Sequence, residues 1–401
     1  MLRYTLLKTS AKLEGKNTAK AKLSSLDTAD DTPRATCDPM AFQTAVTRSF
    51  TAPAQRLPPE LLGEIFLHLQ KHEPSMLELI ELDCVIARVC TSWRHIALGT
   101  PRLWSSIDVR SDTVDAEKCL RRYLPRSKSC PLEITCDTAG QPGLLPLLCE
   151  HASRWQSLIL QMSSADYRAV TPIDTPLLLR AKIFISDVVD AEHPGLLRFL
   201  QYTPRLHMLL IRGGGIEAAA KLSLPKSPVL TTLHLDFLDS PSSYSLASVL
   251  STIRQYRKTL EILELGFNSD AAALSSEKAT GGTMTFPELD FLCVLGVGNK
   301  LLPHISTPNL RTLSVDTRQA TLPSVLLDFL ERGPLNIHTL DLLYNFNGRS
   351  ASEADIATLL RCMSRMEGLE KMRVNRCPVT EAFLAGLVWN MGVILSGKSK
   401  D

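Results

Sequence analysis

Two short patterns in this chain have the spacing of a chemical site. His68 and His72 lie four residues apart, which places both imidazoles on one face of a helix, a geometry that can hold a metal ion. The glutamate of a His-Glu-x-x-His motif is absent and no third ligand follows, so a solvent-facing helix surface explains the pair better. Residues 213–218 read Gly-x-Gly-x-x-Ala, and Asp236 follows about twenty residues later, as in a dinucleotide-binding turn. Only a short run precedes Pro225, too little for a crossover helix, and we interpret this segment as a loop between two neighbouring units.

The rest of the chain offers no catalytic arrangement. It contains no Gly-x-Ser-x-Gly and no paired Cys/His cluster. The ten cysteines show no Cys-x-x-Cys spacing and mostly sit in apolar stretches, which favours buried thiols in a reducing compartment. We therefore expect no catalytic residue, no metal site and no cofactor, and a small-molecule enzyme is a distant alternative.

Charge and hydropathy exclude two classes of partner. A net charge of +2 over 401 residues argues against nucleic acid, because neutralising several phosphates needs a concentrated basic face. The most apolar segment, residues 382–395, is too short to cross a membrane and contains Asn390. We expect a cytoplasmic or nuclear protein with a lysine-rich disordered tail at residues 1–55. The sequence does not distinguish the two locations or give the tail a role.

Helical apolar stripes mark the segment from residue 56 to 104. Pro58 and Pro59 suit a first helical turn, and Glu60 complements the positive end of the helix. Apolar residues then recur at helical spacing, and again from Val89 to Ala97. About fifty residues form too small a unit to bury all of this apolar surface, so we expect a partner or the following domain to cover part of it.

The sequence of this segment resembles an F-box. Leu57-Pro58-Pro59-Glu60 opens a helix, Val89-Cys90-Thr91-Ser92-Trp93 opens a second, and Leu103-Trp104 closes the unit. The interval 70–85 is longer than that family usually has. The resemblance implies that nine residues lie at or just behind an adaptor-binding surface: Leu57, Pro58, Leu61, Leu62, Ile65, Phe66, Val89, Cys90 and Trp93. From periodicity alone, five of them, Leu61, Ile65, Phe66, Val89 and Trp93, serve equally well as the core of a helical cap on the array.

One apolar pattern, here called the phrase, recurs along residues 105–395. Its apolar residues are spaced three and then two positions apart, and its copies follow at roughly 20 to 30 residues, an interval typical of leucine-rich repeats. Its copies include Trp104/Ile107/Val109, Leu132/Ile134, Trp155/Leu158/Leu160, Ile183/Ile185, Leu206/Leu209/Ile211, Leu230/Leu233/Leu235, Leu260/Leu263/Leu265, Leu289/Leu292/Val294, Leu310/Leu313/Val315, Ile337/Leu340/Leu342 and Leu369/Met372/Val374. Asn268, Asn345 and Cys377 extend three copies. Helical runs precede several copies, at 196–202, 247–256, 324–332 and 355–366. Each unit then pairs a strand with a helix, and stacking creates a shared core.

We therefore predict an α/β fold. A helical F-box domain at 56–104 precedes a degenerate leucine-rich repeat solenoid at 105–395, with a parallel concave sheet, a helical cap at 381–395 and a disordered tail at 396–401. Strand residues between the apolar ones point to the concave face. Seven of them are candidates for client binding: Arg212, His234, Asp236, Glu264, Asp316, Asp341 and Arg373. A solvated sheet face is an equally good reading; if the face binds, its acids favour a basic client segment.

The resemblance implies a substrate receptor of an SCF-type ubiquitin ligase. Its partners would be a Skp-type adaptor, a cullin scaffold reached through that adaptor, and a protein client that the sequence does not identify. Such a chain breaks no bond itself and acts by proximity. The alternative is a repeat scaffold whose F-box-like helices only cap the array.

Overall fold

The computed structural model describes residues 57–72, 86–110, 113, 115–138, 141, 143–163, 166, 173–186, 200, 202–213, 224–238, 246–267, 282–316, 322–332, 336–343 and 353–375. The chain divides into two compact units, Met1–Pro59 and Glu60–Asp401. The predicted tails at 1–55 and 396–401, the cap at 381–395, the helical run at 196–202 except for Leu200 and Tyr202, and Asn268, Asn345 and Cys377 lie outside the described residues. The predicted domain limits stay predictions.

The first helices begin where the sequence places helix-starting residues. Helix α3 runs over Pro59–His72 with Pro59 at its first position and Glu60 in its first turn. Helix α5 covers Thr91–Gly99, and a 3₁₀ turn, η3, follows at Pro101–Trp104. In both α3 and η3 a proline occupies the start, where its missing N–H leaves no helical hydrogen bond unmade.

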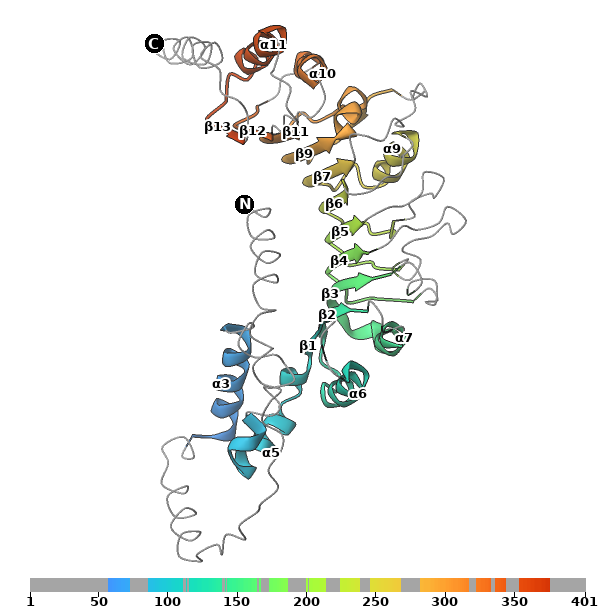
Figure 1. Cartoon of the computed structure of the whole chain (residues 1–401), viewed down its shortest axis with the longest axis vertical. Helices are drawn as coiled ribbons and strands as arrows, with labels where there is room; N and C mark the ends of the chain where they lie inside the picture. The colour runs from blue at the N-terminus through green and yellow to red at the C-terminus, as the bar shows by residue number, and fades with distance from the viewer. Residues whose placement is uncertain are drawn as a thin grey trace, which may run out of the picture. The chain divides into compact units, whose positions relative to one another are not determined.

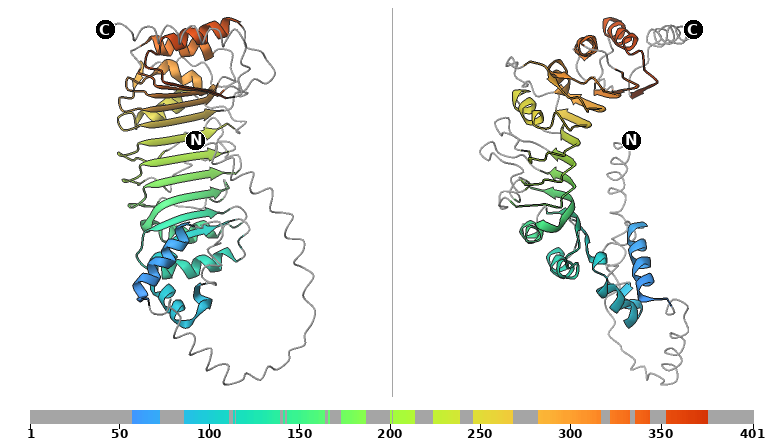
Figure 2. Two further views of the ribbon diagram at one scale, coloured as in Figure 1. Left: turned by 90° about the vertical axis from the view of Figure 1, so that its left-hand side faces the viewer. Right: turned by 180° about the vertical axis from the view of Figure 1, so that it is seen from behind.

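Eleven strands form one parallel sheet in strict chain order, which Figure 1 and the views of Figure 2 show as a stack. They are β1 (Ser106–Val109), β2 (Leu132–Asp137), β3 (Trp155–Met162), β4 (Arg180–Ile185), β5 (Met208–Gly213), β6 (Thr232–Phe237), β7 (Ile262–Phe267), β9 (Phe291–Gly296), β11 (Thr312–Asp316), β12 (Thr339–Leu343) and β13 (Lys371–Asn375). A second, two-stranded sheet pairs β8 (Met284–Thr285) with β10 (Ile305–Ser306). The predicted large parallel sheet is therefore present.

Helices connect several of these strands, as parallel pairing requires a crossover. They are α6 (Ala116–Arg126), α7 (Leu144–Cys149), η4 (Ala152–Arg154), α9 (Leu246–Arg254), η6 (Val297–His304), α10 (Leu322–Glu331) and α11 (Glu353–Ser364). Helices α6, α7 and α9 lie on the same side of the sheet (Figure 1). The expected runs at 247–256, 324–332 and 355–366 correspond to α9, α10 and α11 within two residues, whereas α6 and α7 were not predicted.

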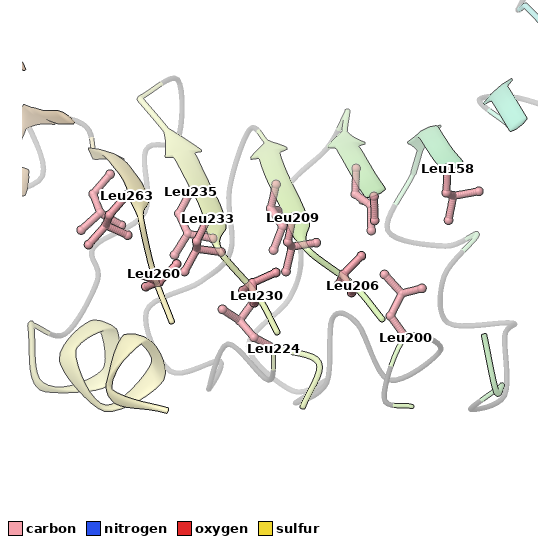
Figure 3. Close-up of a cluster of buried hydrophobic side chains, with 14 of the residues drawn as sticks. Leu158, Leu200, Leu206, Leu209, Leu224, Leu230, Leu233, Leu235, Leu260 and Leu263 are labelled. Carbon is pink, nitrogen blue, oxygen red and sulfur yellow. The ribbon is translucent and has the colours of Figure 1, made fainter. Parts of the chain in front are cut away.

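The core is built from the repeated apolar phrase. Leu209, Leu233 and Leu263 are fully buried and pair in register on neighbouring strands. Leu206 and Leu230 precede Leu209 and Leu233 by three residues and lie in a second buried row beside them (Figure 3). Each strand contributes apolar side chains at equivalent positions, so no strand could bury its apolar face without its neighbours.

A Thr-Pro turn precedes several strands, a feature that the sequence reading did not recognise. The backbone N–H of Leu178 donates to the carbonyl of Thr175 at 3.2 Å, and Leu206 does the same with Thr203. Proline follows the threonine in each case and presets the backbone for the second position of a turn. In these copies the turn places the buried leucine at the start of the strand unit.

Candidate functional site: an exposed apolar helix surface and an open sheet face

Exposed apolar side chains concentrate near the amino end of the described chain. Seven large hydrophobic residues are exposed among the described residues, and six of them lie between residues 57 and 98. Three of the six are spaced four apart on α3: Leu61 is 52% exposed, Ile65 42% and Leu69 45%. Residues four apart share one face of a helix, so they form one apolar stripe, here called the α3 stripe.

The opposite side of α3 is packed. Phe66 is fully buried, and its ring centroid lies 5.0 Å from that of Trp93 on α5 at a tilt of 55°. Leu62 is 3% exposed. A Cβ atom on Gly63 would come within 3.3 Å of the Thr100 hydroxyl, so glycine permits the close approach of α3 to the end of α5. The helix that carries the α3 stripe is thus packed on its other side against α5.

The start of α5 is fixed by Cys90. Its sulfur accepts a hydrogen bond from the backbone N–H of Trp93 at 3.5 Å, which makes Cys90 the N-cap of the helix. Residues 86–89 are also helical, and Val89, next to the cap, is 55% exposed. Cys90 therefore orients the helix that carries Trp93 and leaves Val89 facing outward.

Trp104 connects these helices to the first strands of the sheet. Its indole Nε1 donates to the carbonyl of Ala97 at 2.9 Å. Its ring meets Tyr123 of α6 edge-on at 4.9 Å, and the guanidinium of Arg126 lies over it at 4.3 Å. Trp104 is buried, its N–H is hydrogen-bonded, and it has an aromatic and a cationic neighbour, so it packs η3 and α5 against α6.

Residues 54–110 match the F-box-like family. This match supports an F-box protein, and F-box domains typically bind Skp-type adaptors. It covers α3, α5, η3 and β1. No curated protein matches the chain.

The structure separates the nine adaptor-binding candidates into two groups within or beside the F-box-like helices. Leu57, Pro58, Leu61, Ile65 and Val89 are exposed. Leu62 and Phe66 are buried, and Trp93 and Cys90 are partly buried. The first group is available to touch a partner, while the second positions the helices. Leu69, at 45% exposure, and Leu98, at 39%, were not among the candidates although they share the same apolar character.

The two imidazoles considered for metal binding gain no further ligand. Within the described residues, no group of three or more His, Cys, Asp or Glu side chains is arranged to hold a metal ion. The side chain of His68 is exposed and that of His72 is not described.

The second candidate surface is the face of the sheet that carries the residues between the buried leucines, here called the open face. Strand pairing places its central positions in one continuous row, here called the middle row. The row contains Ile159, Lys182, Leu210, His234, Glu264, Cys293, Ser314, Asp341 and Arg373. A parallel row contains Gln161, Phe184, Arg212, Asp236, Gly266 and Leu295. The side chain of the remaining candidate, Asp316, is not described.

Neighbouring strands pair the acids of this face with bases. Asp236 lies 3.6 Å from Arg212, and the Asp341 carboxylate accepts from Arg373 at 3.2 Å. His234 Nδ1 lies 2.7 Å from a carboxylate oxygen of Glu264, and the His234 side chain is only 8% exposed. These contacts correct the expectation of an acidic surface: three of the four predicted carboxylates face a base on the next strand. The basis for preferring a basic client segment is therefore lost.

The dinucleotide-like turn also has a structural use. Gly213 ends β5 with its missing Cβ 3.0 Å from the Cβ of Ile185, so a side chain there would press on the neighbouring strand. Asp236 binds Arg212 and accepts the backbone N–H of Leu238 at 3.3 Å, which occupies the carboxylate that a ribose would need. Residues 214–220 lie outside the described part.

Seven cysteines lie in the described part of the chain. They are Cys90, Cys119, Cys130, Cys136, Cys149, Cys293 and Cys362, and no disulfide joins any two of them. Burial raises the pKa of the Cys136, Cys149 and Cys362 thiols to about 12. At neutral pH such thiols carry almost no thiolate, the reactive form. No helix in the described segments is long and apolar enough to span a membrane.

Proposed function

We propose that this chain is a substrate-receptor subunit of an SCF-type ubiquitin ligase. The F-box-like helices bind a Skp-type adaptor, which connects the chain to a cullin scaffold. The strand array is a degenerate leucine-rich repeat solenoid that holds a protein client. The chain is not an enzyme: it contributes proximity, raising the local concentration of client lysines near a ubiquitin-loaded enzyme.

One observation carries this proposal: exposed apolar side chains concentrate in the segment that matches the F-box-like family. Scattered exposed leucines are ordinary on any surface, but a clustered set marks an interaction site. The array leaves a single exposed large hydrophobic in its described part, Tyr202. The adaptor-facing role therefore falls to α3 and its neighbours, and not to the sheet.

The alternative is a scaffold whose helices only cap the array. The contacts of Trp104 with Tyr123 and Arg126 would serve such a cap equally well. A cap, however, has no use for an exposed α3 stripe. This difference separates the two functions.

Reconstitution tests the proposal. The full chain is co-expressed with a Skp-type adaptor and a cullin and separated by size-exclusion chromatography. We expect the three proteins to elute as one complex, and the cullin to be lost when the adaptor is left out. A full chain that elutes alone in the presence of folded adaptor supports the cap function instead. Changing Leu57 and Pro58 to alanine is the companion variant, expected to weaken the complex.

A further inference from the structure

The open face is not uniform along the sheet. In the middle row, His234, Cys293 and Ser314 are buried at 6%, 6% and 4% exposure. Earlier in the array, Arg180, Gln161 and Arg212 are exposed, and Lys182 and Leu210 are half-buried. Exposed side chains of the open face therefore lie on β3, β4 and β5, and further out on β2 (Glu133) and β13 (Lys371 and Arg373), while three of the middle-row side chains between β5 and β13 are buried.

Strands β3, β4 and β5 carry bases and no acids. Their sequences contain Arg180, Lys182 and Arg212, and neither Asp nor Glu. Arg212 already faces Asp236 at 3.6 Å. Neither Arg180 nor Lys182 takes part in a salt bridge within the described residues, and the acid in Arg180's own row, Glu133, lies two strands away on β2. Two cations on one strand are therefore left for an external anion.

Apolar side chains accompany these cations. Ile159 and Leu210 flank Lys182 in the middle row, and Phe184 lies two residues further along β4 beside Arg212. All three are half-buried, so each keeps part of its apolar surface accessible. A ligand that matches this arrangement presents negative groups with apolar groups beside them.

We propose that the open face of β3–β5 docks an extended acidic segment of the client protein, with carboxylates at two positions spaced two residues apart. Arg180 and Lys182 lie two residues apart on β4, a separation of about 6.6 Å that equals the repeat of same-side residues in an extended ligand. Two carboxylates of such a ligand reach both cations at once, while its apolar side chains contact Ile159, Leu210 and Phe184. This inference rests on the proposed function, because it describes the client side of the same receptor.

The test uses the full chain and a displayed library of random extended peptides of about ten residues. Wild-type protein is expected to enrich peptides with two acids spaced two residues apart and with apolar neighbours. The double variant Arg180→Glu/Lys182→Glu is expected to bind the enriched peptides at least about tenfold more weakly, with the remaining affinity less sensitive to salt.

A matched control has the same change in charge elsewhere. Arg257 and Lys258 are both exposed and lie in the turn after α9, outside β3, β4 and β5. The variant Arg257→Glu/Lys258→Glu is expected to keep wild-type peptide binding. Equal losses in the two variants, enrichment of basic peptides, or no enrichment by charge would each overturn the proposal.

Adaptor binding by the same protein preparations distinguishes this inference from the proposed function. Adaptor binding without acidic-peptide selection refutes the docking face alone. Acidic-peptide selection without adaptor binding refutes the ligase function and leaves a peptide-binding array.

Discussion

Replacing Leu61 and Ile65 together by alanine probes the part of α3 that faces outward. Covering a whole Leu or Ile side chain contributes about 1.5–3 kcal/mol. The free chain leaves 52% of Leu61 and 42% of Ile65 exposed, so an adaptor that covers both removes slightly less than one full side chain from water. The double variant should lose about 1.4–2.8 kcal/mol of binding free energy, or about 10- to 100-fold in affinity. Alanine has the highest helix propensity, so α3 itself should persist.

Isothermal titration of the full chain with a Skp-type adaptor measures this loss. The control is Tyr202→Ala, which removes the one exposed large hydrophobic that the described residues have outside the F-box-like segment, a side chain that is 60% exposed. Its affinity should equal that of the wild type. An unchanged affinity in Leu61→Ala/Ile65→Ala, with circular dichroism like that of the wild type, would refute the assignment of the α3 stripe to the adaptor.

Three further perturbations test how the fold supports both surfaces. Phe66→Ala removes a fully buried ring packed on Trp93 and should cost about 3–5 kcal/mol, seen as faster amide exchange throughout α3, whereas Leu69→Ala should change exchange little. The Arg154 guanidinium donates to Ser127 and to the carbonyls of Leu124, Lys128 and Cys130 at the end of α6. Arg154→Lys keeps the charge and loses the guanidinium hydrogen bonds, so chemical unfolding should show a loss of about 1–2 kcal/mol in the free energy of unfolding. The control Arg121→Lys, in its exposed pair with Glu117, should lose under about 0.5 kcal/mol. Burial, and secondarily the charge of Arg154, lowers the pKa of His151. Because the unfolded chain then binds the proton more readily, the free energy of unfolding should fall as pH drops through about 6.5. Unfolding curves at about pH 7.5 and about pH 5.5 should show a smaller fall for His151→Gln than for the wild type. An equal fall in the two proteins would contradict the pKa shift.

Apolar spacing was enough to predict the strands of the sheet. The phrase in Leu206/Leu209/Ile211 and its copies fixes which side chains face inward, and alternation then fixes the middle row from Ile159 to Arg373. Strand order follows as well, because each unit can bury its apolar side chains only against the units before and after it.

Charge on the open face could not be read in the same way. Counting acids along the chain suggested an acidic surface, but contacts run across strands, where Arg212 meets Asp236 and Glu264 meets His234. The looser copy on β4 hid the most useful bases, Arg180 and Lys182, because only its last two apolar positions matched the phrase. An alignment of the units against each other, with charges compared between neighbours, would have exposed both.

Two helices were missed for a related reason. The apolar positions of α6, Leu120, Tyr123 and Leu124, have helical spacing but lie among three arginines and a lysine, which suggests a solvated segment. Helix α7 contains Pro146 within a run of leucines. Both helices form because the sheet offers them an apolar surface to cover, and this tertiary effect is invisible to local propensity.

Hydrogen exchange of the full chain with and without a Skp-type adaptor tests the central claim most directly. The account predicts that the adaptor slows exchange in α3 and at residues 86–98, with no change along β3–β13. Unchanged exchange in α3 in the presence of saturating adaptor, or protection confined to the sheet, would contradict the claim that this apolar helix surface is built for an adaptor.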